Sequence, residues 1–493
     1  MRDKLRQLTK DTVLYGLSTI VGRFLNFLLI PLYTHFFQPS DYGVLSILYS
    51  FIALLNIFFL FGMDSGYLKF AGSESPDLKQ TILKTALTPV FFIDGLLILF
   101  LLVCQPQLSS MLSIPAEFQH LWYYVAGILL LDSLSALPYI SLRLQKKALR
   151  FSVIRISNIV LNIVINIILI LFFKMGIESV FISNLAASFL TFAILIPELF
   201  EFRFGHFDKA LLKRLLTFGL PYLPAGIASM FMQVIDRPIV ERLKGFKVLG
   251  IYQANYRLGI FMMLYVSMFQ YAWQPFFLEN AKEENSKEIF AKVFTYFSAV
   301  GAIVLVVISF FIFDAATLEV RHFSLIGRAY WSGLSIVPVV LLAYLFNGFY
   351  VNFSAGLFIK EKSIVFPLIM AIGAIVNVDA NFLLVPRYDI MGAALATLLS
   401  YFLMAVGFYF ASSRIYPIKY EWGKMSIILV LIAVYGALYY TFLDFLNSHI
   451  MIRIALVAMF ILVLFVTRVF TVEAMKMLVK RKIIEKPMGA GKT

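Results

Sequence analysis

Two arginines inside long apolar runs are the side chains best suited to bind an anion. Arg23 has Asn26 three residues later, on the same face of a helix, and Arg257 follows Asn255 and Tyr256. A guanidinium group matches two phosphate oxygens at once and keeps its charge in any environment. The pattern predicts a polar, cationic site with one arginine from each half of the chain. The structural alternative is that each arginine pairs with a buried acid, and the candidate partners are Asp64, Asp94 and Asp236.

A second polar group lies around residues 233–237. Gln233 precedes Asp236 by three residues and Arg237 by four, so it shares a helix face with both. We expect this group to add contacts to the arginine site, and a local ion pair in an interfacial turn is the alternative for Arg237. Prolines bracket the segment and predict bends in it, at positions 221, 224 and 238.

Three carboxylates within apolar runs are candidates for ion coupling: Asp94, Asp132 and Asp379. A carboxylate held away from water can take up a proton or a sodium ion, which is the chemistry that an antiporter needs. The alternative role is a hydrogen bond to a neighbouring serine or asparagine.

The sequence lacks the residue patterns of enzymes and cofactor-binding proteins. The C-terminal Gly-Ala-Gly-Lys-Thr resembles the end of a phosphate-binding loop, but Lys486 stands where that loop requires its first glycine. Cys104 is the only cysteine, and no histidine has the spacing of a metal ligand: His35, His120, His206, His322 and His449. We therefore expect no catalytic residue, metal or cofactor.

The composition identifies the elements that must position these side chains. Of 493 residues, 61% are apolar and only 14% are charged, which is too few charges for a water-facing surface. Apolar runs predict an all-α integral membrane protein with about fourteen transmembrane helices. The predicted spans lie at approximately 12–36, 42–62, 82–103, 120–141, 152–173, 177–197, 214–239, 248–272, 290–313, 330–353, 363–385, 390–411, 424–444 and 451–470. Rossmann-type enzymes and secreted disulfide scaffolds are excluded.

The basic residues predict how these spans are oriented. Of 42 Lys and Arg residues, 31 fall on the side of the N-terminus and nine on the opposite side, with Arg23 and Arg257 inside spans. Because cytoplasmic loops are enriched in Lys and Arg, both termini are predicted to be cytoplasmic in a multi-pass protein of the cytoplasmic (inner) membrane. The net charge of +14 is thereby explained without a nucleic-acid partner.

An internal repeat divides the predicted spans. A shift of 207 residues aligns Pro31 with Pro238 and Gly43 with Gly250. Asparagines four residues apart recur in spans five and eleven and are candidates for contacts between helices: Asn158, Asn162 and Asn166, then Asn377 and Asn381. We expect six spans in each of residues 1–204 and 205–413, related by a pseudo-two-fold axis along the membrane normal, then two spans and a basic cytoplasmic tail in 414–493.

Two stretches resemble a known family. Residues 15–71 read YGLSTIVGRFLNFLLIPLYTHFFQPSDYGVLSILYSFIALLNIFFLFGMDSGYLKFA, and residues 377–403 read NVDANFLLVPRYDIMGAALATLLSYFL. They resemble the first two spans and the span eleven to twelve junction of Wzx-type oligosaccharide flippases of the multidrug/oligosaccharidyl-lipid/polysaccharide (MOP) superfamily. The resemblance implies twelve core helices in two lobes around a central cavity, with two extra C-terminal helices.

The function implied by the resemblance is translocation of a polyprenyl-pyrophosphate-linked oligosaccharide to the outer leaflet by alternating access. The product would serve O-antigen, capsule or exopolysaccharide synthesis. Implied partners are the lipid-linked oligosaccharide, membrane lipids, a proton or sodium ion and other polysaccharide assembly proteins. The residues assigned to the pyrophosphate-bearing headgroup are Arg23, Asn26, Gln233, Asp236, Arg237 and Arg257.

Two other transport functions stay open on the same scaffold. An ion-coupled multidrug or cation antiporter would need a carboxylate as the main charge in its cavity, and a lipid-linked peptidoglycan precursor flippase would use the same cationic site. A membrane glycosyltransferase or polymerase is disfavoured, because the longest outer connection, approximately 104–119, contains one acid, Glu117.

Overall fold

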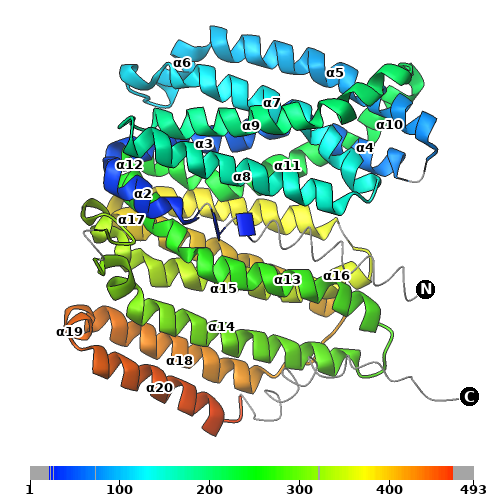
Figure 1. The fold of residues 1–493 in the computed structure, drawn as a ribbon. Helices are drawn as coiled ribbons and strands as arrows, with labels where there is room; N and C mark the ends of the chain where they lie inside the picture. The colour runs from blue at the N-terminus through cyan, green and yellow to red at the C-terminus, as the bar shows by residue number, and fades with distance from the viewer. Residues whose placement is uncertain are drawn as a thin grey trace, which may run out of the picture. The chain divides into compact units, whose positions relative to one another are not determined.

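The computed structural model describes residues 21–469 except 23, 26, 73, 320–322 and 363. The regular elements of these residues are all helices (Figure 1). Ten of the helices are long and apolar enough to cross a membrane. The prediction of an all-helical membrane protein is therefore confirmed.

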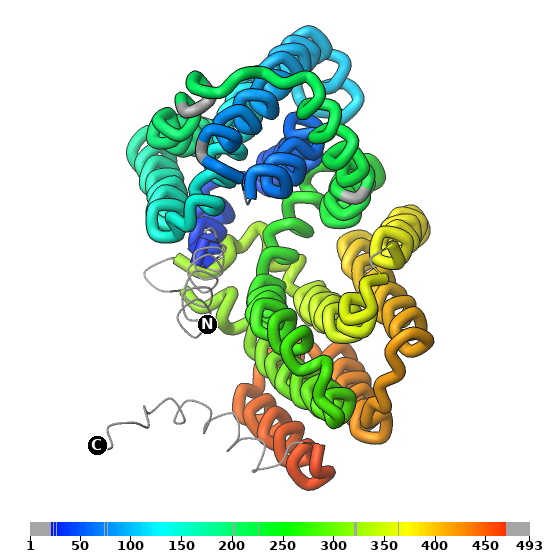
Figure 2. Tube along the Cα trace, turned by 90° about the vertical axis from the view of Figure 1, so that its right-hand side faces the viewer, coloured from blue at the N-terminus to red at the C-terminus, as the bar shows by residue number. Residues whose placement is uncertain are grey.

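The helices form two compact units. Unit 1 takes its described residues from Met1–Ile260, Thr317–Ile336 and Phe366–Ser400. Its elements are α2 (Leu29–Phe36), α3 (Pro39–Leu60), α4 (Met63–Ala71), α5 (Pro76–Val103), α6 (Gln105–Met111), η1 (Ala116–Phe118), α7 (Leu121–Leu144), α8 (Ala148–Leu171), α9 (Glu178–Phe200), η2 (Glu201–Phe204), α10 (Lys209–Gly219), α11 (Tyr222–Val234), α12 (Asp236–Tyr256), η3 (Arg257–Gly259), η4 (Arg328–Ile336) and part of α17 (Val365–Ile415). In Figure 2 the blue-to-cyan tubes of this unit pack side by side.

Unit 2 takes its described residues from Phe261–Ala316, Val337–Val365 and Tyr401–Thr493. Its elements are α13 (Ile260–Asn280), α14 (Ser286–Thr317), α15 (Val337–Phe353), α16 (Ala355–Ile359), the end of α17, α18 (Trp422–Thr441), α19 (Leu443–Ser448) and α20 (Ile450–Val466). The division of the chain at 204/205 and 413/414 stays a prediction.

Helix α12 reverses direction at Gly245. The backbone angles there, φ 83° and ψ 172°, are adopted readily only by glycine. The Tyr252 hydroxyl donates a 2.8 Å hydrogen bond to the carboxylate of Asp236, whereas sixteen residues of straight helix would separate the two by about 24 Å. The two arms of α12 therefore run back along each other, and the 72-residue candidate span Lys209–Asn280 is not one straight crossing.

Helix α17 also folds back. Asp389 has a non-helical φ of 49° and ψ of −130°. A Cβ atom on Gly392 would lie only 2.4 Å from the carbonyl oxygen of Leu384, although residues eight apart in a straight helix are separated by about 12 Å. The 51-residue helix is therefore a hairpin whose turn coincides with the predicted boundary between spans eleven and twelve.

Helices α3 and α12 cross at two glycines. A Cβ atom on Gly43 would lie 2.1 Å from the carbonyl oxygen of Phe246, and one on Gly250 would lie 1.8 Å from that of Pro39. The repeat shift of 207 residues equates Pro39 with Phe246 and Gly43 with Gly250. Each contact is thus the counterpart of the other, as a local two-fold relation between α3 and α12 requires.

Connections that were predicted to share one side of the membrane contact each other within unit 1. On the predicted outer side, Lys244 forms an ion pair with Asp389. On the predicted inner side, the Lys84 ammonium group donates a 3.0 Å hydrogen bond to the Gly205 carbonyl. These contacts agree with the alternation of the spans, while the side that faces the cytoplasm stays a prediction.

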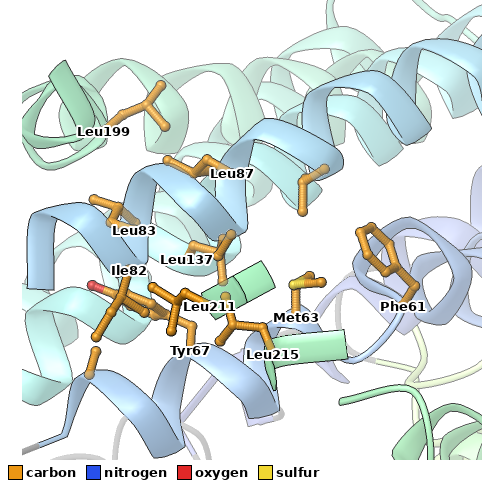
Figure 3. Close-up of a cluster of buried hydrophobic side chains, with 13 residues drawn as sticks. Phe61, Met63, Tyr67, Ile82, Leu83, Leu87, Leu137, Leu199, Leu211 and Leu215 are labelled. Carbon is orange, nitrogen blue, oxygen red and sulfur yellow. The ribbon is translucent and has the colours of Figure 1, made fainter. Parts of the chain in front are cut away.

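The end of unit 1 that is predicted to face the cytoplasm has a closely packed apolar core (Figure 3). Phe61, which follows α3, and helices α4, α5, α7, α9 and α10 contribute its side chains. The residues from these helices include Met63, Tyr67, Ile82, Leu83, Leu87, Leu137, Leu199, Leu211 and Leu215. Close approach of backbones supports this packing, since a Cβ atom on Gly219 would lie 2.4 Å from the Gly62 carbonyl oxygen. The short helix α10 is therefore held against the bundle by its leucine face.

An ion pair joins α20 to α14 in unit 2. Arg453 is 1% exposed, donates a 2.8 Å hydrogen bond to the Phe310 carbonyl and binds both carboxylate oxygens of Asp314. A buried cation needs such a partner, because its charge is poorly solvated away from water.

We expect Asp314→Asn to lower the free energy of unfolding by about 1–2 kcal/mol, because it removes the charge opposite a buried guanidinium group. Thermal unfolding of the detergent-solubilised protein measures the effect. Glu319→Gln is the matched control: it removes the acid from the exposed Arg328–Glu319 pair and should cost at most about 0.5 kcal/mol. Equal shifts in the two variants would contradict the prediction.

Candidate functional site

Arg257 lies among tyrosines at the end of the second arm of α12. Its guanidinium carbon is 5.5 Å from the centroid of the Tyr42 ring. The group is also within electrostatic range of the hydroxyls of Tyr33, on α2, and Tyr49, on α3. A guanidinium group over an aromatic face is attracted to the ring but is not neutralised by it. The Tyr42 ring therefore does not balance the charge of the Arg257 guanidinium group.

No carboxylate of the described residues lies within ion-pair distance of Arg257. Asp236, one of the acids considered as its structural partner, accepts the hydrogen bond from Tyr252 instead. The structure thus gives no support to the buried ion pair as the role of Arg257. Its part in substrate binding stays a prediction.

Asp236 and Arg237 begin the first arm of α12, inside the bundle. Asp236 is 6% exposed, and Arg237 donates a 2.8 Å hydrogen bond from Nη1 to the Ser50 hydroxyl of α3. The arm ends at Gly245, eight residues or about 12 Å beyond Arg237. The helix extends beyond the predicted boundary at 239, so Arg237 lies in a helix and not in a turn, and its role in substrate binding stays a prediction.

Unused hydrogen-bonding capacity remains in this pair. The Nε atom of Arg237 and the Oδ1 atom of Asp236 are buried without a hydrogen-bond partner among the described residues. Arg237 and Arg257 both lie within electrostatic range of Tyr42, so the fold brings two predicted cations toward one ring. Gln233, in contrast, is exposed on α11 and donates to the Ser229 carbonyl at 3.3 Å.

Two predicted site residues, Arg23 and Asn26, lie outside the described residues. Their assignment to the headgroup therefore stays a prediction. Of the bends predicted at the three prolines, the one at Pro221 is confirmed, because this residue separates α10 from α11, whereas Pro224 lies within α11 and Pro238 within α12.

The three candidate coupling acids have different surroundings. Asp94 on α5 is completely buried beside Ser133 of α7, yet neither carboxylate oxygen has a hydrogen bond of normal geometry to a described residue. Asp132 accepts a 2.7 Å hydrogen bond from the Ser188 hydroxyl of α9. Asp379 is exposed on α17. Asp94 is therefore the candidate whose surroundings leave most room for a bound proton or cation.

Asn166 connects three helices of unit 1. It accepts a 3.1 Å hydrogen bond from the Tyr33 hydroxyl of α2, and its amide donates to Ser183 of α9 and to the Asn162 carbonyl at 3.0 Å. Close by, Asn184 donates to the Tyr49 hydroxyl at 3.0 Å. These contacts confirm the expected interhelical role of Asn166.

The tyrosines around Arg257 were not identified from the sequence. Tyr42 and Tyr49 are seven residues apart, hence on one face of α3, and Tyr33 is on the preceding helix. That spacing was available as a signal, but in a chain with 25 tyrosines it does not single out these three.

Comparisons with known proteins show the family to which this chain belongs. A family model described as "Polysaccharide biosynthesis protein" matches residues 8–281. A relative from Haemophilus influenzae, described as "Uncharacterized membrane protein", is 21% identical over 286 residues, which are 57% of this chain and 67% of the relative.

Solved structures share the fold across most of the chain. The lipid II flippase MurJ in an inward closed conformation superposes with a TM-score of 0.71 and 17% identity, covering 96% of this chain and 100% of MurJ. An inward-facing multidrug resistance MATE family transporter of the MOP superfamily superposes with a TM-score of 0.64 and 14% identity, covering 80% of this chain and 94% of the transporter. At such identities the likeness concerns the fold, and it confirms the predicted MOP-type architecture.

Proposed function

Because this chain belongs to the polysaccharide biosynthesis protein family, we propose that it moves a polyprenyl-pyrophosphate-linked oligosaccharide from the inner to the outer leaflet of the cytoplasmic membrane. It is a MOP-type membrane transporter of polysaccharide biosynthesis and not an enzyme. The observation that supports the substrate most directly is Arg257, a guanidinium group over the Tyr42 ring without a described acidic partner.

The energetic cost of this arrangement favours an anionic ligand. An arginine at the centre of a bilayer costs at least about 2.5 kcal/mol, so it persists mainly where water, a partner or a substrate meets its charge. A pyrophosphate supplies several acceptor oxygens for a guanidinium fork, and tyrosine hydroxyls can donate to phosphate or sugar oxygens. Arg257 and Arg237 are therefore our candidates for the described part of the headgroup site, together with Arg23 and Asn26.

The transport cycle that we propose uses fourteen spans in two six-helix lobes plus two C-terminal helices. The count includes both arms of the Lys209–Asn280 and Val365–Ile415 candidates, the short apolar helix α20 and the predicted span 12–36. The reciprocal contacts of Gly43 and Gly250 support the duplication. Alternating access would then expose the headgroup site to each side in turn.

Membrane potential can drive this transport without ATP. Outward movement of an anionic headgroup is favoured by about 2.3 kcal/mol per charge at an inside-negative potential of 100 mV. If a cation is exchanged as well, we propose Asp94 as its first binding residue, since it is buried without a hydrogen bond of normal geometry to a described residue. Asp132 and Asp379 remain the other candidates.

A reconstituted flipping assay tests the proposal. The purified full chain is placed in liposomes with a fluorescent polyprenyl-pyrophosphate oligosaccharide, and a membrane-impermeant periodate reagent reports headgroups that reach the outside. We expect a faster exposure than in protein-free liposomes, and imposed proton or sodium gradients identify the coupling ion. An unchanged rate would contradict the proposal, and transport of a lipid-linked peptidoglycan precursor or a cationic dye instead would reassign the substrate.

A further inference from the structure

Helices α4 and α10 present two exposed cations around one pair of aromatic rings. The rings of Phe70 and Phe218 are 5.8 Å apart in an edge-to-face arrangement. The Lys69 ammonium group lies 4.0 Å from the centroid of Phe218, and the Arg214 guanidinium carbon lies 5.1 Å from that of Phe70. Each cation is therefore stacked on the ring of the neighbouring helix.

The stacking holds the cations without neutralising them. Neither Lys69 nor Arg214 has a carboxylate of the described residues within ion-pair distance, and both are exposed. Both lie within 6 Å of the same Phe70 ring, at 5.9 Å and 5.1 Å from its centroid. Long cationic side chains that are already restricted lose less conformational entropy when they bind an anion.

The surroundings fit the headgroup layer of a membrane. Next to the pair along the chain, Phe204 is 81% exposed, Phe207 44% and Tyr222 51%, which is unfavourable in water but usual for interfacial aromatic side chains. Helix α10 buries Leu211 and Leu215 in the core of Figure 3 and exposes its basic face. A helix with an apolar face against the bundle and a basic face outward is suited to the edge of the bilayer, next to the lipid headgroups.

We propose that Lys69 and Arg214 form a binding site for the phosphate of an anionic phospholipid headgroup. The ligand is a lipid and not a soluble anion, because the exposed ring of Tyr222 packs against Phe218, with the ring centroids 5.3 Å apart, where acyl chains can cover it. The site is separate from the predicted substrate site, and binding at it can be measured without transport.

Native mass spectrometry of the full chain in a neutral detergent tests the site, with phosphatidylglycerol and phosphatidylcholine titrated in separate series. We expect tighter binding of phosphatidylglycerol than of phosphatidylcholine. The double variant Lys69→Gln/Arg214→Gln should lose about 30-fold in affinity for phosphatidylglycerol, because each basic residue near an anionic headgroup contributes a factor of about five to the binding constant. Phosphatidylcholine binding should not change.

The matched control is Lys282→Gln/Lys360→Gln, which removes two exposed cations without ring contacts among those described, and we expect it to stay within twofold of the wild type. The charge-conserving variant Lys69→Arg/Arg214→Lys should also retain the affinity. Equal losses in the first double variant and the control, or no loss in the first, would overturn the proposal. Inorganic phosphate at about 10 mM, an ordinary buffer concentration, should not displace phosphatidylglycerol. Displacement at that concentration would show that the site binds a soluble anion and not a lipid.

Discussion

An Arg257→Ala variant is expected to insert and fold but to flip lipid-linked oligosaccharide about 10-fold to 150-fold more slowly than the wild type. Hydrogen bonds to a charged group contribute about 1.5–3 kcal/mol, and loss of the guanidinium fork removes this stabilisation from the bound pyrophosphate. Folding should be little affected, because Arg257 has no ion pair with a described acid that the substitution would break. Initial rates in the liposome assay measure the effect.

A second variant at this position separates the effect of the charge from that of the guanidinium geometry, and a variant at an exposed arginine serves as the control. Arg257→Lys keeps the charge but loses the bidentate fork, so we expect an intermediate rate. Arg328→Ala removes an exposed arginine that is paired with Glu319, and it should flip at the wild-type rate. Wild-type flipping by Arg257→Ala would remove Arg257 from the proposed substrate site, whereas equal defects in Arg257→Ala and Arg328→Ala would indicate a general effect of lost charge.

The second large effect is expected at the crossing of α3 and α12. In Gly250→Ala the added methyl group would lie 1.8 Å from the carbonyl oxygen and 2.7 Å from the carbonyl carbon of Pro39. Backbone atoms cannot rotate away as a side chain does, so the helices must separate. We expect the free energy of unfolding to fall by about 3 kcal/mol, measured by thermal unfolding in detergent.

Gly95→Ala is the matched control for this substitution, because it adds the same methyl group to a helix at a site with nothing within 4 Å. It should be neutral or stabilising by up to about 1 kcal/mol, since alanine favours helices over glycine. Gly43→Ala should resemble Gly250→Ala, as the reciprocal contact requires. Equal stabilities of Gly250→Ala and Gly95→Ala would show that the helices tolerate separation at the crossing.

Much of the fold could be predicted because a bilayer restricts it. Every backbone polar group in the hydrocarbon layer must be paired internally, so long apolar runs become helices and the hydropathy of a run is sufficient to place it. The turn between spans eleven and twelve was predicted correctly at residues 385–390, where Asp389 interrupts α17. The predicted end of span seven at 239 is not the end of a helix, since the first arm of α12 continues through charged residues to Gly245.

The sequence identified several residues of the candidate site but not their partners. Charged groups in apolar runs identified Arg257, Asp236 and Asp94, since the cost of burying a charge makes such positions rare. Their partners were not predicted. Arg237 binds Ser50, which is 187 residues away, and hydropathy or local spacing contains no information about a contact at that distance.

The sequence by itself determined that this protein is an all-helical membrane protein, because insertion into lipid depends on the local composition of each segment. The family followed from the resemblance of residues 15–71 and 377–403 and is shown by the family model over residues 8–281. The sequence also aligned Gly43 with Gly250 in the repeat, but the close approach of the two helices at these glycines is a finding of the structure. Only the tertiary structure decided that Arg257 lies over Tyr42 without a described acid beside it, while Asp236 is bound to Tyr252. The physical reason is that the neutralisation of a buried charge depends on which helices pack together, and the reversal at Gly245 and the crossing at Gly43 and Gly250 establish that packing.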